Sequence, residues 1–158
     1  LENVLLPTEI AGTPTREDKN RALDLLKLVG LEDFAFSFPA QLSGGMQQRV
    51  ALARLLQTGA DILLLDEPFG ALDEFTREHL NMELMRIVEE VGATTIFVTH
   101  NIAEAIFLAD QVVVMTSRPG RMAKIVDVDL ERPRSLSLQT SVAFNKLVEE
   151  VRETLGEM

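Results

Sequence analysis

Apolar residues recur every three or four positions in the first third of the chain, which is the spacing of an amphipathic helix. Thr15 and Asp18 form the pattern of an N-terminal capping pair, and Gly30 marks a helix end. Between them lies one apolar stripe, formed by Ala22, Leu25, Leu26 and Val29. Because a second helix is predicted from 43 to about 58, we expect residues 1–58 to form a helical subdomain.

From residue 61 onward, short apolar runs alternate with amphipathic segments. The runs predict strands at 61–66, 94–99, 111–116 and 126–130. The amphipathic segments predict helices at 74–91, at 101–109 with Asn101 as N-cap and Glu104 at the reciprocal position, and at 140–155. A continuous apolar run favours a strand covered on both faces, and strand–helix alternation favours parallel pairing. The chain is therefore predicted to be an α/β protein with a doubly wound layer.

Each long helix of this second part carries one apolar stripe that we expect to face a core. The stripe of the helix at 74–91 comprises Leu80, Leu84, Ile87, Val88 and Val91. The stripe of the C-terminal helix comprises Phe144, Leu147, Val148, Val151 and Leu155.

Composition narrows the class of protein. A length of 158 residues suits one domain, and 46% apolar residues are sufficient for a hydrophobic core. The net charge of −10 argues against a nucleic-acid binder, which normally presents a basic face. The chain has no cysteine and therefore no disulfide or thiolate metal site. No apolar run approaches roughly 18–20 residues, so no transmembrane helix is predicted within it.

The segment Leu42-Ser43-Gly44-Gly45 stands directly before an apolar helical run. A helix N-terminus presents unpaired backbone N–H groups and a partial positive charge, which suit a phosphate. Glycine lets the backbone approach an anion because it has no Cβ. The alternative is that Ser43 is an ordinary N-cap and the two glycines belong to a loop.

Asp66 and Glu67 follow the strand predicted at 61–66, and the carboxyl ends of strands are where open α/β sheets bind ligands. Nucleoside triphosphate hydrolysis needs one carboxylate for Mg²⁺ and a second group to activate the attacking water. Because adjacent strand residues point to opposite sides, we assign Asp66 to the metal and Glu67 to the water. The alternative is a strand that ends in two solvated acids.

Two further polar residues stand at ends of predicted elements. His100 follows Thr99 after the next strand, where it could donate a hydrogen bond to a γ-phosphate. Asp73 follows Ala71-Leu72 in a tight turn before the helix at 74–91. The alternatives are a solvent-facing histidine and a simple helix N-cap. Each residue alone is a weak signal, whereas the order of all these segments is specific.

The combination resembles the signature motif and Walker B motif of the ATP-binding cassette (ABC) ATPases, and the resemblance covers the whole chain. Three segments near the C-terminal end are more similar to the ATPase subunits of nitrate/sulfonate/taurine-type importers. These are Glu104-Ala105-Ile106-Phe107-Leu108-Ala109-Asp110, Arg118-Pro119-Gly120-Arg121 and Glu131-Arg132-Pro133-Arg134. The resemblance implies a partial P-loop NTPase sheet with helices, preceded by the helical subdomain.

The resemblance also implies a function, a set of partners and a role for each residue. Family members hydrolyse ATP with Mg²⁺ as a head-to-tail pair of ATPase subunits on a membrane permease. They act peripherally at the cytoplasmic face of the membrane and indirectly serve a periplasmic or extracellular substrate-binding protein. The resemblance implies that Ser43 and Gly45, with Gly44 between them, bind the γ-phosphate and that Gln48 supports this signature loop. It implies that Asp66 serves Mg²⁺ and that Glu67 is the general base. It also implies that His100 is the switch histidine and that Asp73 communicates across the dimer.

The phosphate-cradling sequence G-x-x-x-x-G-K-[ST] does not occur in the chain. Its four lysines are Lys19, Lys27, Lys124 and Lys146, and none follows a glycine. Together with a first residue that is not methionine, this predicts the C-terminal portion of a longer ATPase, inactive alone. The expected divisions are the helical signature subdomain at 1–58, a partial RecA-like core at 59–134, and a C-terminal helix packing on the core at 135–158.

Three functional hypotheses follow. The first is part of an importer ATPase, whose substrate stays open among nitrate, sulfonates, taurine, bicarbonate and pyrimidine precursors. The second is a non-hydrolysing interaction module or decayed fragment that docks on a permease or on a partner ATPase. The third is a chromosome-maintenance or repair ATPase, against which the acidic charge and the missing heptad repeats argue.

Overall fold

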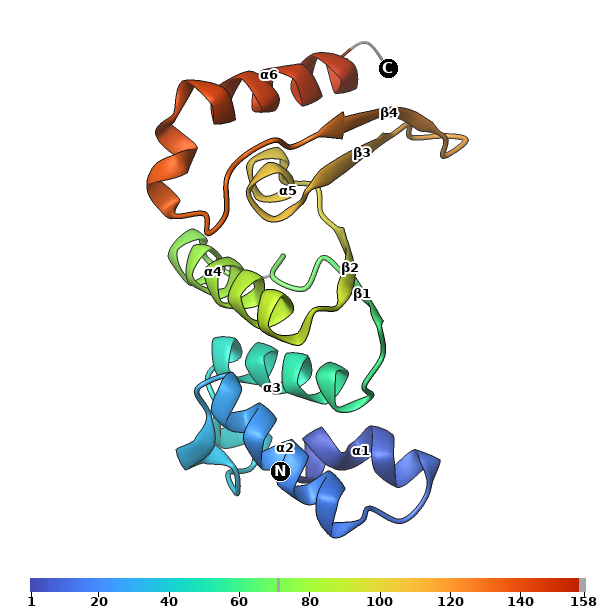
Figure 1. Cartoon of the computed structure of the whole chain (residues 1–158), viewed down its shortest axis with the longest axis vertical. Helices are drawn as coiled ribbons and strands as arrows, with labels where there is room; N and C mark the ends of the chain where they lie inside the picture. Colours follow the sequence, from blue (N-terminus) through green and yellow to red (C-terminus); the bar gives the residue numbers. More distant parts are fainter. Residues whose placement is uncertain (71, 157–158) are drawn as a thin grey trace. The chain divides into compact units, whose positions relative to one another are not determined.

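A computed structural model describes residues 1–70 and 72–156 of the chain. It divides into two compact units, Leu1–Ile96 and Phe97–Met158. Within the described ranges, no helix is long and apolar enough to cross a membrane. The elements (Figure 1) are α1 (Glu2–Ala11), α2 (Arg16–Leu28), the 3₁₀ turns η1 (Glu32–Phe34) and η2 (Pro39–Gln41), α3 (Gly44–Gln57), β1 (Ile62–Asp66), α4 (Glu74–Val91), β2 (Thr94–Val98), α5 (Ile102–Leu108), β3 (Gln111–Met115), β4 (Met122–Asp127), η3 (Leu136–Thr140) and α6 (Val142–Gly156).

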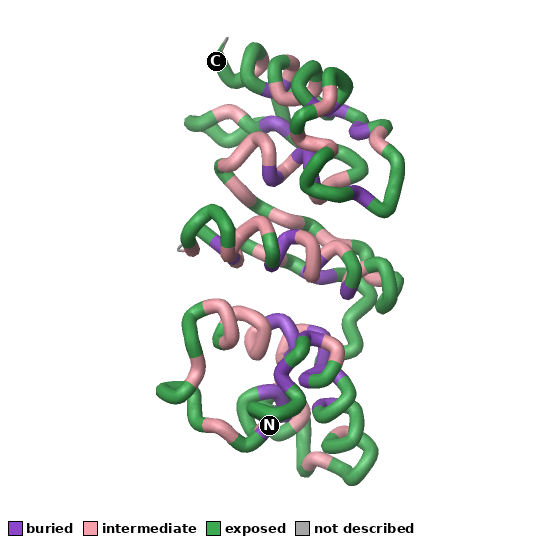
Figure 2. Tube along the Cα trace, turned by 90° about the vertical axis from the view of Figure 1, so that its left-hand side faces the viewer, coloured by how far each residue is buried: buried purple, intermediate pink, exposed green. Residues whose placement is uncertain are grey.

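The first unit begins with the three helices α1, α2 and α3. The predicted capping pair of α2 is confirmed, because the Asp18 amide donates to Thr15 Oγ1 (3.2 Å) and the Thr15 amide donates to Asp18 Oδ2 (2.8 Å). Helix α2 ends before Gly30, which has a φ of +69°. All four residues of its apolar stripe are buried, and Figure 2 shows the buried positions gathered where these helices meet.

A buried amide joins the three helices. Gln57, at the end of α3, is only 7% exposed, and its Nε2 donates to Thr8 Oγ1 (3.2 Å) and to the Asp18 carbonyl (3.1 Å). Arg21 adds a hydrogen bond from Nη2 to the Leu56 carbonyl (3.1 Å). These bonds connect the end of α3 to α1 and α2 and thereby fix where α3 runs.

Strand β1 pairs with β2, and the amide of Thr94 donates to the Asp61 carbonyl at 2.9 Å. Leu63 is 1% exposed, whereas Ile62 and Leu64 are 58% and 68% exposed. The prediction that this strand is covered on both faces is therefore wrong for the described residues. Successive side chains alternate between the faces of a strand, and only the face of Leu63 is covered.

Helix α4 connects these strands and has the predicted bounds. Three residues of its predicted stripe are buried, namely Leu80, Leu84 and Ile87. Val91 is 44% exposed, so its assignment to the inward face is wrong: it is the last residue of the helix, directly before Gly92, whose φ is +70°. Arg86 Nη2 donates to the Leu28 carbonyl (2.7 Å), which connects α4 to the end of α2.

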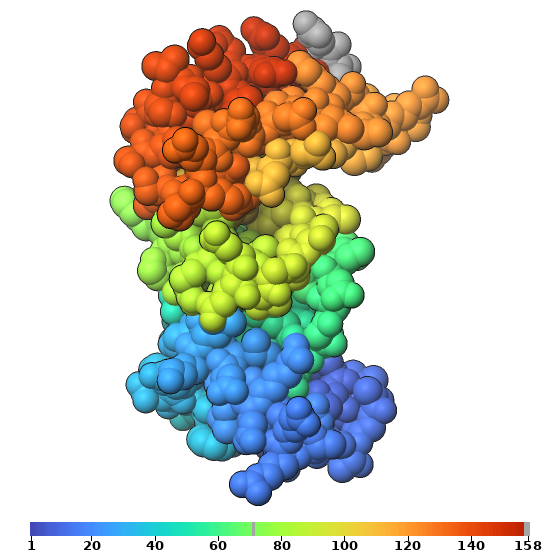
Figure 3. Space-filling model, viewed as in Figure 1, coloured from blue at the N-terminus to red at the C-terminus, as the bar shows by residue number. Residues whose placement is uncertain are grey.

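In the second unit, β3 and β4 form an antiparallel hairpin in which Val113 is paired with Ile125. The predicted parallel pairing therefore does not extend to these strands, which the loop 116–121 with Pro119-Gly120 connects. Val112, Val114 and Val126 are buried on one face, while Val113 and Ile125 are about half exposed on the other. The hairpin projects from the body of its unit (Figure 3).

Helices α5 and α6 complete the core of the second unit. Phe107 of α5 is 1% exposed, and Phe144 and Val151 of α6 are 2% and 3% exposed. Leu155 is 43% exposed, so its predicted inward orientation is wrong: it stands near the end of α6, where burial ends. Positions 157 and 158 of the predicted C-terminal segment lie outside the described residues.

Candidate functional site

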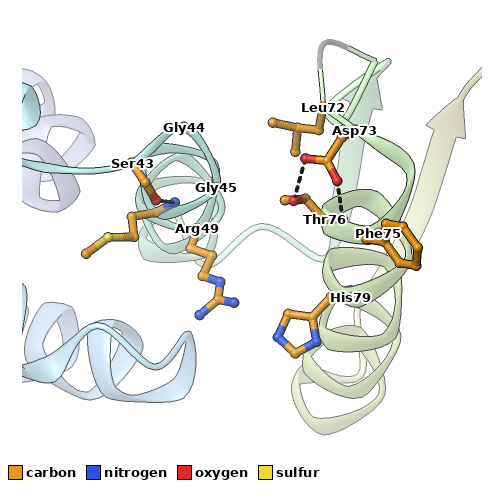
Figure 4. A pocket seen from close by; sticks show the side chains of 10 residues that line it. Ser43, Gly44, Gly45, Arg49, Leu72, Asp73, Phe75, Thr76 and His79 are labelled. Carbon is orange, nitrogen blue, oxygen red and sulfur yellow. Dashed lines mark hydrogen bonds between the residues drawn. The ribbon is translucent and has the colours of Figure 1, made fainter.

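A pocket of about 690 Å³ lies between the N-terminal turns of α3 and α4, both in the first unit (Figure 4). It brings together four of the predicted site residues, namely Ser43, Gly44, Gly45 and Asp73. The other lining residues are Met46, Arg49, Leu72, Phe75, Thr76 and His79. Gln48, Asp66, Glu67 and His100 do not line it.

The α3 side of the pocket is a capped helix start. Ser43 Oγ accepts a hydrogen bond from the Met46 amide (3.3 Å), which leaves the N–H groups of Gly44 and Gly45 as first-turn donors without an acceptor in their own helix. A Cβ at Gly45 would lie 3.4 Å from Thr76 Cγ2, so glycine permits α3 to come close to α4 here. Two N–H groups, a hydroxyl and the positive helix end fit a phosphate oxygen.

Gln47 holds the loop before this helix start. Its Nε2 donates to the carbonyls of Pro39 (3.0 Å) and Leu42 (3.3 Å). The sequence interpretation gave the loop-supporting role to Gln48, whereas these two hydrogen bonds come from its neighbour. Two adjacent glutamines give the same local signal, and only the direction of each side chain on the helix distinguishes them.

The α4 side of the pocket is the turn that contains Asp73. Asp73 Oδ1 accepts from the Thr76 amide (3.0 Å) and Oδ2 accepts from the Thr76 hydroxyl (2.7 Å), which confirms the N-cap role. Arg77 Nη2 donates to the Leu72 carbonyl (2.7 Å) and holds the same turn. Ala71, the first residue of the predicted Ala71-Leu72-Asp73 segment, lies outside the described residues.

The capping hydrogen bonds make the Asp73 carboxylate sensitive to acid. Hydrogen bonds from Thr76 hold the pKa of the Asp73 carboxyl below its ordinary value, and the bond from the hydroxyl contributes more than the bond from the amide. A depressed pKa contributes stability that is present above the unfolded-state pKa and is lost as the pH falls through the folded-state pKa. We expect Thr76→Val to raise the pKa of Asp73 in a carboxyl-detected NMR titration, whereas Thr76→Ser should not. Equal pKa values in both variants would contradict this assignment.

A carboxylate connects the two helices behind the pocket. Glu83 Oε2 lies 2.9 Å from Arg49 Nε in an ion pair, and its other oxygen lies 3.5 Å from His79 Nε2. Figure 4 shows Arg49 and His79 extending from α3 and α4 into the space between the helices, with the Phe75 ring pointing away from α3. No role was predicted for Arg49, His79 or Glu83, because no local sequence pattern pairs Arg49 with Glu83.

Asp66 and Glu67 stand at the end of β1, as predicted, and both are exposed. Glu67 has a φ of +43°, a left-handed conformation that costs a non-glycine residue on the order of 1–3 kcal/mol. The Gly70 amide donates to the Glu67 carbonyl (3.1 Å) and closes the turn. Such strain is concentrated at functional sites, which supports a role for Glu67. Carboxylate oxygens suit Mg²⁺, but the described residues contain no group of three His, Cys, Asp or Glu ligands.

His100 belongs to the second unit. It is exposed and stands between β2 and Asn101, whose side chain accepts the Glu104 amide (3.1 Å) as the predicted N-cap of α5. The role of His100 as the switch histidine stays a prediction.

These features combine, in one α/β protein, a serine–glycine helix start that fits a phosphate with a strand that ends in two acids. Residues 1–70 match the family model described as ABC transporter. The taurine import ATP-binding protein TauB of Rhizobium johnstonii is 48% identical over 98% of this chain and 61% of its own length. The aliphatic sulfonates import ATP-binding protein SsuB of Bacillus cereus is 45% identical over 84% of this chain and 52% of its own length. The chain belongs to the ABC transporter ATP-binding proteins.

Solved structures support the fold. An ABC transporter in an inward-facing conformation superimposes with a TM-score of 0.70 at 23% identity over 79% of this chain and 51% of its own. The cbiO1 protein of Clostridium perfringens, part of the ABC transporter complex cbiONQ, gives a TM-score of 0.63 at 30% identity over 70% of this chain and 44% of its own. The chain spans about half to three fifths of the length of the curated relatives named above.

Proposed function

We propose that this chain is the signature-bearing part of the ATP-hydrolysing subunit of an importer of the nitrate/sulfonate/taurine type. The observation that carries the proposal is the pocket that joins Ser43, Gly44 and Gly45 to Asp73. The relatives' names, which refer to taurine import and aliphatic sulfonates import, support the subgroup. The transported substrate is not fixed by any residue of the pocket.

In this proposal the start of α3 binds the γ-phosphate of an ATP molecule that a second ATPase subunit holds. Ser43 Oγ and the amides of Gly44 and Gly45 donate to phosphate oxygens, and Gln47 keeps the loop in place. Asp73 is part of the turn that faces the same nucleotide. These groups orient and neutralise the phosphate without moving a proton.

The remaining roles belong to the chain's own nucleotide. Asp66 holds Mg²⁺ through water, Glu67 accepts the proton of the attacking water, and His100 donates to the γ-phosphate. Mg²⁺, when bound there, would supply charge neutralisation on the phosphates. The strained backbone at Glu67 supports its role as proton acceptor, because the turn holds this residue in one conformation, whereas a flexible chain would not.

A permease subunit is the proposed membrane partner, which would place the chain peripherally at the cytoplasmic face and would couple it indirectly to a substrate-binding protein. Three phenylalanine side chains are exposed rather than packed in a core: Phe34 is 44%, Phe36 is 83% and Phe38 is 72% exposed. Three exposed aromatic side chains next to the loop before α3 would suit an apolar helix of the permease.

The 158-residue chain alone is expected to show no steady ATP turnover, because no G-x-x-x-x-G-K-[ST] segment in it can cradle the β- and γ-phosphates. Phosphate release by the purified chain should equal that of its Glu67→Gln variant. Glu78→Gln on α4 is the matched control for purification and background. Steady release by the unchanged chain that Glu67→Gln abolishes would overturn this expectation.

The second candidate is a non-hydrolysing interaction module, which the same missing segment favours. It predicts that the chain associates with an ATP-loaded intact subunit but has no nucleotide affinity of its own. Equilibrium dialysis of the isolated chain against ATP and Mg²⁺ tests this second candidate: retained ATP excludes the module, and absent retention with ATP-dependent association is what it requires.

A further inference from the structure

Helix α5, which begins two residues after His100 with Asn101 as its N-cap, ends at a buried arginine. Arg134 lies in the segment after β4 and is only 4% exposed. Its Nη1 donates to three carbonyls at the end of α5, those of Ile106 (3.2 Å), Phe107 (2.9 Å) and Ala109 (2.8 Å). Its Nε and Nη2 donate to the Leu130 carbonyl (3.4 and 3.3 Å), and Nη2 also donates to the Val128 carbonyl (3.5 Å). One guanidinium therefore binds the last turn of α5 to the chain beyond β4.

The carbonyl oxygens, rather than an ion pair, stabilise this charge. The nearest acid, Asp110, lies 3.8 Å from Arg134 Nη2 and is bound more closely by Arg132 at 2.8 Å. Burial lowers the pKa of Arg134, yet a guanidinium remains charged in proteins. The carbonyls at a helix C-terminus carry the negative end of the dipole, so they attract this cation.

The other end of α5 is also held by side chains. The Thr99 hydroxyl donates to Glu104 Oε2, and the Asn101 amide donates to Thr99 Oγ1 (3.1 Å). Glu104 is 8% exposed, and its amide donates to the Asn101 side chain. His100 stands between two residues that belong to this closed set of hydrogen bonds.

We propose that Arg134 is a positioning residue for His100, acting through α5. The helix has seven residues and is roughly 10 Å long, so it is too short to bend between its fixed ends. Fixing its last turn therefore fixes its first turn and its N-cap Asn101, whose amide hydrogen bond to Thr99 spans His100. The role of His100 in hydrolysis rests on the proposed function, whereas its dependence on Arg134 is a property of the second unit alone.

The test is the ring signal of His100 in an aromatic proton–carbon correlation spectrum of the full chain. The chain has two histidines, so His79 in the first unit is an internal reference, and His100→Gln assigns the signals. We expect Arg134→Lys, which keeps the charge but loses the planar fork, to displace or split the His100 signal and leave His79 unchanged. Arg152→Lys, at an exposed position of α6, is the matched control.

An unmoved His100 signal in an Arg134→Lys variant that keeps its amide dispersion would overturn the proposal. Should that variant not fold, Glu104→Gln tests the opposite end of α5, with the exposed Glu153→Gln as control; an unmoved His100 signal there overturns the proposal equally. Neither readout uses ATP. A displaced signal in a protein without any ATP-dependent association would reject the proposed function and keep this inference.

Discussion

Replacing Gly44 by aspartate is expected to abolish ATP-dependent association of the chain with an intact ATPase subunit while α3 stays folded. Among the described residues, a Cβ at Gly44 would meet only Leu72 Cδ2, at an ordinary contact distance of 3.9 Å. A carboxylate in the first turn of a helix is favourable for the helix itself. It would stand where the phosphate is proposed to bind and would repel it, so the loss should be at least about tenfold in affinity, which corresponds to roughly 1.4 kcal/mol.

The measurement is sedimentation of the chain with the taurine import ATP-binding protein of Rhizobium johnstonii, with ATP and Mg²⁺ and without them. Gly44→Asn is the matched control, because it has nearly the same volume and no charge. Circular dichroism should show the helix content unchanged in both variants. If Asp and Asn variants associate equally well in ATP, the start of α3 does not bind the phosphate, and the proposed function loses the observation that carries it.

Helix starts were the part of the fold that the sequence predicted well, because each cap involves residues within three positions of one another. Thr15 with Asp18, Ser43 before α3, Asp73 before α4 and Asn101 before α5 all cap as expected. The candidate residues Ser43, Gly44, Gly45 and Asp73 were therefore placed correctly at their elements, although nothing in the pattern showed that α3 and α4 bring them to one pocket.

Burial and long-range partners could not be predicted in the same way. Leu64 is apolar and in a strand, yet its exposure depends on what packs against its face of the sheet. In the sequence, Arg134 is only part of the Glu131–Arg134 segment that carries the resemblance, whereas the carbonyls of Ile106 and Phe107 make it a buried structural residue. The Glu83 partner of Arg49 lies on another helix. A hydrophobicity pattern describes one helix or strand at a time, whereas each of these outcomes depends on how two elements pack together.

Truncation of the side chain of Phe107 is expected to cause the largest loss of stability in the second unit. Phe107 is 1% exposed and is one of the two largest fully buried side chains, and α5 contacts both α6 and β3. Truncation of a buried phenylalanine removes its transfer free energy and leaves a cavity, which costs about 3–5 kcal/mol. Since a whole domain is stable by only roughly 5–15 kcal/mol, Phe107→Ala should leave the second unit close to unfolding.

Phe36→Ala is the matched control, because Phe36 is 83% exposed and the same truncation there removes little buried surface. Urea unfolding must be followed by circular dichroism, since the chain has no tryptophan or tyrosine. We expect a markedly lower midpoint for Phe107→Ala only. Equal midpoints in the two variants would mean that α5 is not packed as described, and the path from Arg134 to His100 would lose its rigid helix. The stability of this core and the placement of His100 therefore depend on the same packing.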